Sequence, residues 1–286
     1  MTILEAYAPF TERLKTIYED REAATIADWV FEKVTGLKRW ERKENQDKQL
    51  EENQSKQIDT YLEELLQHKP VQYVLNEAWF YKMKFFVDEN VLIPRPETEE
   101  LVEWVTRDFK NQIHSKPTNI LDIGSGSGCI SIALKKELAH FKITSIDVSE
   151  KALKVAKKNA ENLKVKIDFL QLNFLNESEW KSLPIYDAII SNPPYIPINE
   201  KENLANNVTN FEPGIALFVE TADPIIFYKK IADFAKGHLR KDGRIYVETH
   251  EEYAKEVKAV FENAGYLSEI KKDIYGKERM VRAKKV

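Results

Sequence analysis

Residues 121–128 read Leu-Asp-Ile-Gly-Ser-Gly-Ser-Gly, an apolar run that leads into three glycines at alternate positions. The apolar run predicts a buried strand over residues 119–123, and the spacing of apolar residues predicts a helix over residues 129–138. Glycines between a strand and a helix let a ligand approach the backbone closely, because a Cβ would block it. The stretch therefore predicts a ligand-binding turn in an α/β sheet.

Strand and helix patterns alternate from this turn to the end of the chain. The alternation predicts a doubly wound α/β fold with a mostly parallel sheet, closed at one edge by an antiparallel C-terminal hairpin. The further expected strands are 143–147, 166–170, 186–191, 244–249, 266–271 and 278–283. The further expected helices are 150–162, 224–239 and 251–264, and another begins near Thr98 or Glu99.

The N-terminal quarter of the chain differs from this pattern. Residues 1–72 show helical periodicity and predict a small helical domain, in which Gly36 ends a helix. Residues 39–57 are rich in Lys, Glu, Gln and Asn, which is typical of a solvated helix surface or loop; a partner-binding role is the alternative.

A linker and a larger domain are expected to follow. Residues 73–96 carry aromatic and β-branched residues around Asp88-Glu89-Asn90 and predict a β-hairpin linker. Residues 97–286 then form the domain that holds the sheet.

Composition narrows the class of protein. The chain has 286 residues, a net charge of −4 and a single cysteine, Cys129. Such a length predicts about two domains, and the acidic balance gives no basic field for wrapping nucleic acid. One cysteine permits no internal disulfide, supplies no metal cluster and fits a reducing compartment, where Cys129 is expected to be a packing residue. The chain also lacks an apolar run of membrane-spanning length and a signal peptide, so we expect a cytoplasmic protein with no membrane contact and no bound metal.

The glycine spacing points to a particular cofactor. A dinucleotide fingerprint is Gly-x-Gly-x-x-Gly, whereas here the third glycine comes one residue early and Asp122 precedes the turn. This arrangement resembles the cofactor site of class I methyltransferases, which have a Rossmann-like sheet. The resemblance implies S-adenosyl-L-methionine as the cofactor, bound by the turn residues Gly124, Ser125, Gly126, Ser127 and Gly128.

Two further residues are expected at the cofactor. Asp147 ends the next strand and can accept hydrogen bonds from a ribose diol, although it could instead cap the following helix, for which Ser149 is an equally good candidate. Phe174 follows the third strand and is expected to pack on the adenine ring. Asn173 stands where class I methyltransferases usually have an Asp.

Asn192-Pro193-Pro194-Tyr195 follows the strand 186–191. An Asn side-chain carbonyl, a backbone carbonyl on a chain with two fixed φ angles, and an aromatic face suit the binding of a planar –NH2 group. A strand-ending turn explains these four residues equally well when they are taken alone, but the glycine turn upstream favours the clamp. We therefore expect Asn192, Pro193 and Tyr195 to be catalytic, all four residues to bind the acceptor, and Asn192 also to contact the cofactor.

Three flanking segments resemble the family of peptide chain release factor N5-glutamine methyltransferases, the PrmC/HemK family. They are residues 91–99 (Val-Leu-Ile-Pro-Arg-Pro-Glu-Thr-Glu), Phe211-Glu212-Pro213 with Ala216-Leu217, and residues 273–279 (Asp-Ile-Tyr-Gly-Lys-Glu-Arg). The resemblance covers nearly the whole chain. It departs at Asn173 and at Thr249-His250, where a glycine is expected soon after Glu248.

The resemblance implies a protein substrate and a reaction. The methyl group of S-adenosyl-L-methionine would pass to the side-chain amide nitrogen of the glutamine in the Gly-Gly-Gln motif of a release factor, which acts in translation termination. The helical domain would recognise the release factor, no nucleic acid would be required, and the enzyme would be a monomer. Arg95 and Glu97 would shape the pocket, or would form only a surface ion pair and a helix-start carboxylate.

Three alternatives remain open at this point. A ribosomal-protein glutamine could be the acceptor, or the adenine N6 group of DNA or RNA, which presents the same –NH2 on a flat ring. The third alternative is a non-catalytic protein that binds S-adenosyl-L-methionine and a partner.

Overall fold

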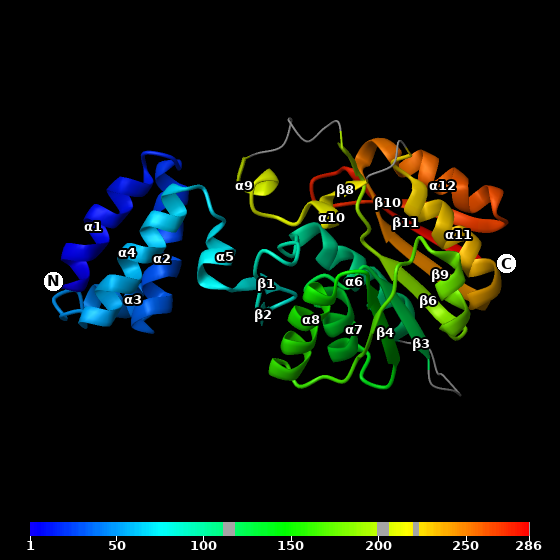
Figure 1. The fold of residues 1–286 in the computed structure, drawn as a ribbon, viewed down its shortest axis with the longest axis horizontal. Coiled ribbons are helices and arrows are strands. Elements are labelled where there is room, and N and C mark those ends of the chain that lie inside the picture. Colours follow the sequence, from blue (N-terminus) through cyan, green and yellow to red (C-terminus); the bar gives the residue numbers. More distant parts are fainter. Residues whose placement is uncertain (111–117, 199–205, 220–222, 286) are drawn as a thin grey trace. The chain divides into compact units, whose positions relative to one another are not determined.

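The computed structural model describes residues 1–110, 118–198, 206–219 and 223–285 (Figure 1). The chain forms two compact units. The first holds Met1–Glu77 and the short helix α9 (Asn206–Thr209), and the second holds most of the described chain from Ala78 onward. Among the described helices none is long and apolar enough to cross a membrane.

The first unit is helical, as predicted. Its helices are α1 (Ile3–Leu14), α2 (Asp20–Thr35), α3 (Arg39–Glu44), α4 (Glu52–Leu66) and α5 (Val71–Leu75). Buried side chains of α1, α2, α4 and α5, among them Phe10, Val30 and Leu62, form one core. Gly36 ends α2 with a left-handed φ of 71°, which glycine adopts without strain.

The charged stretch 39–57 is less solvated than the sequence suggests. Arg42 on α3 is buried, forms an ion pair with Asp28 of α2 and donates from Nη1 to the Leu37 carbonyl (3.0 Å). A buried guanidinium needs such partners to offset its lost hydration. The rest of the stretch is largely exposed, as predicted.

The hairpin that follows has its turn in a different place from the one predicted. Strands β1 (Ala78–Phe80) and β2 (Met83–Phe85) pair antiparallel, and the turn consists of Tyr81 and Lys82, with φ values of 50° and 62°. The prediction of a turn at Asp88-Glu89-Asn90 is wrong. Asp88 instead accepts a hydrogen bond from Asn90 N (3.0 Å) in a separate turn. Tyr81 and Lys82 gave no turn signal in the sequence, since neither is a Gly, Asn or Asp.

The second unit contains a seven-stranded sheet in the order β10-β11-β9-β6-β3-β4-β5. Strands β9, β6, β3, β4 and β5 are parallel, while β10 and β11 form an antiparallel hairpin at one edge, as predicted. The strands are β3 (Asn119–Ile123), β4 (Lys142–Asp147), β5 (Asp168–Gln171), β6 (Tyr186–Ser191), β9 (Leu239–Glu248), β10 (Tyr266–Lys272) and β11 (Glu278–Lys285). Their bounds agree with the prediction to within two residues, apart from β9, which begins at Leu239 instead of Arg244.

Helices cover both faces of this sheet (Figure 1). Side chains alternate between the faces along each strand, so Ile120 packs with one layer of helices and Leu121 with the other. One layer contains α6 (Pro96–Lys110), α7 (Cys129–Glu137) and α8 (Glu150–Asn162), and the other contains α11 (Ile226–His238) and α12 (Ala254–Asn263). The doubly wound α/β fold is confirmed.

Short elements complete the second unit. The 3-10 helix η3 (Glu251–Tyr253) forms the first turn of the predicted helix 251–264, directly before α12. The elements without a sequence signal are the 3-10 helix η1 (Glu177–Ser182), the helix α10 (Gly214–Leu217), and the two-residue strands β7 (Ile196–Pro197) and β8 (Phe218–Val219), which pair in parallel. The segment from α10 to β8 forms part of the wall of the site described next.

Candidate active site

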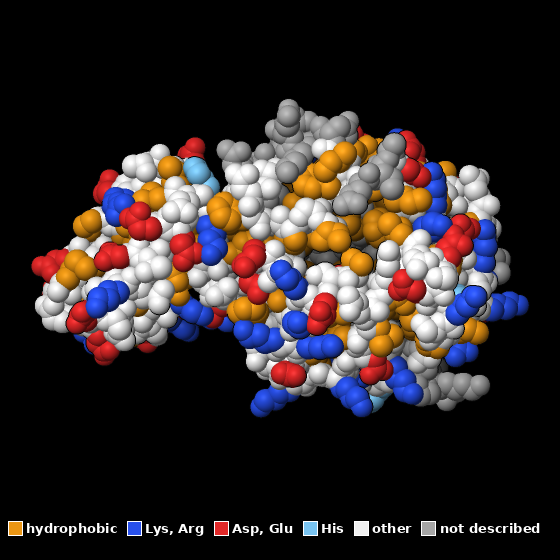
Figure 2. Space-filling view, in the orientation of Figure 1, with side chains coloured by type: hydrophobic (Ala, Val, Ile, Leu, Met, Phe, Trp, Pro, Cys, Tyr) orange, Lys and Arg blue, Asp and Glu red, His pale blue; other side chains and the backbone are white. Residues whose placement is uncertain are grey.

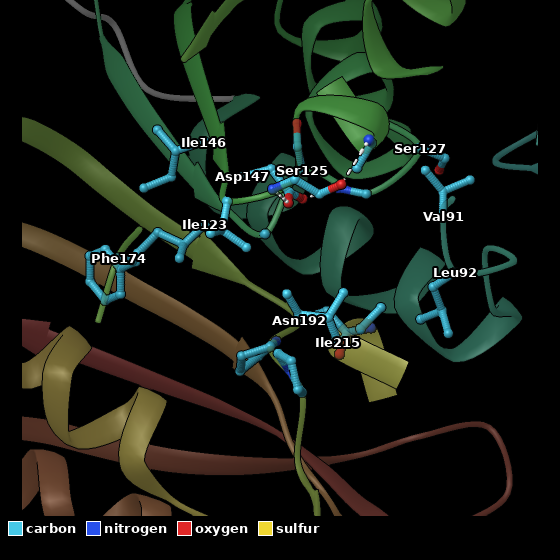
Figure 3. Close-up of a pocket in the computed structure, with 18 of the residues that line it drawn as sticks. Val91, Leu92, Ile123, Ser125, Ser127, Ile146, Asp147, Phe174, Asn192 and Ile215 are labelled. Carbon is cyan, nitrogen blue, oxygen red and sulfur yellow. Dashed lines mark hydrogen bonds between the residues drawn. The ribbon is translucent and has the colours of Figure 1, made fainter. Parts of the chain in front are cut away.

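A cavity of about 340 Å³ opens at the carboxyl ends of the parallel strands (Figure 3). The chain runs from β3 to β4 and β5 on one side and returns to β6 on the other side of β3, so the cavity lies where the direction of strand order reverses. Ligands of open α/β sheets bind at this position. The walls come from the β3–α7 turn, the ends of β4 and β6, the loop after β5, and residues 90–98 and 215–219.

The three glycines of the β3–α7 turn all have left-handed backbone angles. The φ values are 86° at Gly124, 51° at Gly126 and 79° at Gly128, a region that side chains with a Cβ rarely adopt. At Gly128 a Cβ would also lie 3.1 Å from Ile132 Cδ1 and 3.2 Å from Ala156 Cβ. Close packing of α7 against α8, and not ligand approach, is therefore what excludes a side chain at Gly128.

Asp147 ties this turn to the end of β4. Its Oδ2 accepts from Gly126 N (2.9 Å), and its Oδ1 accepts from Ser149 N (2.9 Å). Burial raises the pKa of the Asp147 carboxyl, and the backbone N–H of Gly126 opposes this effect. The cap of α8 is Ser149, whose Oγ accepts from Ala152 N (3.2 Å), so Asp147 is not needed as the helix cap.

A chain of buried polar groups supports the turn from behind. Ser125 Oγ lies 2.6 Å from Ser145 Oγ, and Ser145 Oγ donates to Asp122 Oδ2 (2.8 Å). Asp122 is fully buried and is not part of the cavity wall. Burial raises the pKa of Asp122 to about 7, against the lowering effect of the Ser145 hydrogen bond. The acidic residue before the turn thus acts on the turn through two serines.

Asn192 lies across the cavity from Asp147 (Figure 3). Pro193 and Pro194 also line the cavity, whereas Tyr195 is not among the lining residues. The Tyr195 ring is half-buried, and its centroid lies 6.1 Å from that of His250. Burial raises the pKa of Tyr195, so the phenol stays protonated.

The Asn192 amide is held by side chains from distant parts of the chain. Its Nδ2 donates to Thr98 Oγ1 (3.1 Å), and Thr98 Oγ1 donates to Glu248 Oε2 (2.6 Å). Neither Thr98 nor Glu248 was singled out as a site residue from the sequence. Thr98 has the position of an ordinary residue of the first turn of α6, and Glu248 that of the end of a strand.

At the other end of the cavity, Phe174 is only 4% exposed. Its ring stacks on Trp180, with 5.4 Å between centroids, so a ligand could reach only a small part of it. Asn173 also lines the cavity, and its Oδ1 accepts from Leu175 N (3.1 Å). An Asp would accept the same hydrogen bond, so the departure from the usual residue leaves this turn intact.

Arg95 is more than a surface residue. Its Nη2 donates to Glu212 Oε1 (2.5 Å), and the buried Glu212 also accepts from Ile93 N through Oε2 (3.2 Å). These two bonds fasten the wall segment 90–95 to the loop before α10. Glu97 lies in the first turn of α6, where a carboxylate is favoured by the helix dipole.

The remaining wall is apolar. Hydrophobic side chains gather on the surface over α10 and β8 (Figure 2), where Ile215 is exposed at the cavity. Cys129 also lines the cavity, and burial raises the pKa of its thiol to about 12. The thiol is therefore protonated at neutral pH and is a poor nucleophile.

Comparisons with known proteins agree along the whole chain. The model of the methyltransferase small domain matches residues 101–210, and the model of the PrmC N-terminal domain matches residues 5–75. The chain is 39% identical over 283 residues to a release factor glutamine methyltransferase of Flavobacterium psychrophilum, with 99% of each chain covered. It is 33% identical to one from Bacteroides thetaiotaomicron (95% of this chain, 96% of that one) and 35% identical to one from Lactococcus lactis (96% and 98%).

A solved structure shares the fold at low sequence identity. A methyltransferase from Pyrococcus furiosus aligns with a TM-score of 0.52 and 16% identity, over 79% of this chain and 98% of that one.

We expect Gly128→Ala to lower the free energy of unfolding by about 2 kcal/mol, because alanine is strained at a φ of 79° and its methyl group crowds Ala156. Gly237→Ala on α11 is the matched control, since a Cβ there meets nothing within 4 Å and alanine favours a helix. Urea unfolding of both variants checks the prediction. An unchanged midpoint for Gly128→Ala would show that the turn can relax.

Proposed function

The chain belongs to the family of release factor glutamine methyltransferases, and we propose that it methylates the side-chain amide nitrogen of the glutamine in the Gly-Gly-Gln motif of a peptide chain release factor. The observation that carries this proposal is the placement of Asn192 and Pro193 in the same cavity as the glycine turn and Asp147. A clamp for a planar –NH2 group then lies beside the expected cofactor.

Several features at the Asp147 end of the cavity support S-adenosyl-L-methionine as its ligand. Each Asp147 oxygen accepts one backbone N–H and has a lone pair left for a ribose hydroxyl. Turn residues 124–127 line the cavity, whereas Gly128 does not, and Phe174 and Leu172 offer a purine only the small apolar edge that they expose there. A volume of about 340 Å³ lies within the range of small-molecule sites. When bound, the cofactor supplies an electrophilic methyl group on a sulfonium.

An amide is a poor nucleophile, because the lone pair of its nitrogen is delocalised into the carbonyl. The acceptor end of the cavity is proposed to compensate for this. Asn192 Oδ1 and the Pro193 carbonyl accept the two N–H bonds of the glutamine and orient its nitrogen. These acceptors also stabilise the positive charge that develops as the N–C bond forms and the S–C bond breaks. The proton leaves the nitrogen after transfer, so no strong base is required beforehand. Tyr195, next in sequence, is proposed to pack against the glutamine amide once the substrate has entered.

The parts of the chain are proposed to divide the work. Residues 1–72 recognise the release factor, residues 73–96 link the two parts, and residues 97–286 carry out catalysis. The N-terminal helices offer large exposed side chains, among them Trp29 and Trp40, for contact with a protein. We propose a cytoplasmic monomer that needs no nucleic acid for the reaction.

We expect Asp147→Ala to raise the Kd for S-adenosyl-L-methionine roughly 10- to 100-fold, because it removes charge-assisted hydrogen bonds to the ribose. Isothermal titration calorimetry measures the change. Asp168→Ala serves as the control, since Asp168 is an exposed residue at the start of β5 and lies outside the cavity wall. Equal Kd values for Asp147→Ala and the wild type would remove Asp147 from the cofactor site.

Purified release factor should accept one methyl group from the wild-type enzyme, located on the Gly-Gly-Gln glutamine by peptide mass spectrometry. Asn192→Ala should lower kcat roughly 100- to 1000-fold and change the Kd for S-adenosyl-L-methionine far less, because the main interaction lost is the one made to the acceptor. A release factor with the glutamine changed to Glu is the substrate control. Label in adenine or in a ribosomal protein, with none in the release factor, would reject the proposed substrate.

A further inference from the structure

We propose that Thr98 and Glu248 are positioning residues that decide which end of the Asn192 amide faces the acceptor. The inference rests on the proposed role of Asn192 as the acceptor clamp. An Asn amide has two nearly isosteric ends, and only the oxygen end can accept an N–H from the glutamine. A site that uses Asn in this way needs a device to keep the oxygen turned toward the cavity.

The three side chains form a continuous hydrogen-bonded relay from the interior to the cavity. Glu248, at the end of β9, accepts from Thr98 Oγ1 (2.6 Å), and Thr98 accepts from Asn192 Nδ2 (3.1 Å). Thr98 is 3% exposed and Glu248 is 2% exposed, so water does not compete for these bonds. Asn192 is half-buried, whereas the other two side chains are buried. Asn192 and Thr98 both line the cavity, and Glu248 does not.

The direction of the relay follows from the number of protons that each group has. An ionised carboxylate only accepts hydrogen bonds, so the Thr98 hydroxyl must donate its single proton to Glu248. The Thr98 oxygen then has only lone pairs for Asn192, and the Asn192 group that faces it must be the –NH2. This contact fixes Nδ2 inward and leaves Oδ1 for the acceptor.

The backbone around Glu248 is fixed as well. Tyr228 Oη donates to the Glu248 carbonyl (2.9 Å), and Thr249 N donates to the Arg279 carbonyl (2.8 Å). Across the sheet Glu248 is paired with Met280 of β11. These contacts fix the backbone from which the carboxylate extends, and the relay is therefore preorganised.

Burying a carboxylate without a direct ion pair costs free energy of folding, and such groups cluster at functional sites. Arg279 lowers the Glu248 pKa from a distance but forms its ion pair with Asp273 (3.2 Å), while Glu97 raises it. Tyr195, Tyr228 and Cys129 also interact electrostatically with Glu248, and burial raises the pKa of all three. Burial is the largest influence on Glu248 and raises its pKa to about 7.

This environment makes the relay sensitive to pH. A protonated Glu248 can donate to Thr98, which frees the Thr98 proton to donate to Asn192 Oδ1 and permits the reversed amide. The clamp is therefore correctly polarised above a pH of about 7 and loses its preference below it. The amide nitrogen of glutamine does not titrate in this range, so an acidic loss of rate reports the enzyme.

The first test compares Thr98→Val, Thr98→Ser and Thr106→Val in methyl transfer to the release factor. We expect Thr98→Val to lower kcat about tenfold with less than a twofold change in KM, and Thr98→Ser to stay within about threefold of the wild type. Thr106→Val is the matched control, since Thr106 is also buried on α6 and its hydroxyl has no hydrogen-bond partner among the described residues. Circular dichroism checks that the variants fold.

The outcomes separate this inference from the proposed function. If the wild type methylates the release factor and Thr98→Val does so at the same kcat, the relay is overturned and the proposed function stands. Equal losses in Thr98→Val and Thr98→Ser would also overturn it, because serine retains the hydroxyl. If the wild type itself transfers no methyl group to the Gly-Gly-Gln glutamine, the proposed function fails, and the relay fails with it.

The second test uses pH. The wild-type kcat should fall as the pH is lowered through about 7, whereas Glu248→Gln should show a reduced kcat without this acidic limb, because an uncharged amide cannot fix the Thr98 proton. The Asn192 side-chain –NH2 signals in ¹⁵N NMR, assigned with Asn192→Ala, should titrate near the same pH in the wild type and not in Glu248→Gln. A flat wild-type profile from pH 5.5 to 8.5, or an acidic limb retained in Glu248→Gln, would overturn the assignment.

A stability measurement gives the same titration without catalysis. The folded-state pKa of Glu248 is raised from 4.5 to about 7, so its stabilising effect is present at low pH and is lost as the pH rises through about 7. Glu248→Gln, which does not titrate, should therefore gain stability relative to the wild type between pH 5 and pH 8. The urea midpoints of the two proteins at pH 5 and pH 8 measure this gain. The same difference in midpoint at both pH values would show that Glu248 does not titrate between them.

Discussion

The parallel pairing of β3 with β4 on one side and β6 on the other is the constraint on which the site depends. The register places Ile123 beside Ile146 and beside Ser191, so the three strands end at the same level. The glycine turn, Asp147 and Asn192 each begin within one residue of those positions. A slip of one residue in either pairing would turn the buried side chains of that strand to the other face, and the register of both pairings is therefore strongly specified.

Much of this arrangement could be predicted, because its signals lie within short stretches of the sequence. Strand and helix periods gave the sheet, and the glycine turn and Asn192-Pro193 stand directly after apolar runs. The hairpin turn at Tyr81-Lys82 could not be predicted, because tertiary contact decides it: Tyr81 N donates to Glu99 Oε1 of α6 (2.8 Å). The stronger turn residues at 88–90 form a separate turn after β2.

The roles of Glu212, Thr98 and Glu248 could not be predicted either, because their contacts are also tertiary. Glu212 lies 119 positions from Ile93 and Glu248 lies 150 positions from Thr98, so no spacing in the sequence connects them. Their type gave no signal either, since a lone Glu or Thr is usually a surface or helix residue. Segments 91–99 and 211–213 were noted only through resemblance, and the Arg95–Glu212 pair now gives a physical reason why they belong together.

The two halves of the site rest on the same chemical device. Behind the glycine turn, buried Asp122 accepts from Ser145, which is bonded to Ser125; behind the clamp, buried Glu248 accepts from Thr98, which is bonded to Asn192. In each case an acceptor-only group at or near a strand end sets the direction of a hydroxyl, and the hydroxyl sets the direction of a residue at the cavity. Burial removes the hydration of both carboxylates, which costs free energy and raises the pKa of each carboxyl to about 7. That cost is justified where orientation matters, because a hydroxyl or amide that can turn either way gives a site only part of its binding energy, whereas a fixed one is ready before the ligand arrives.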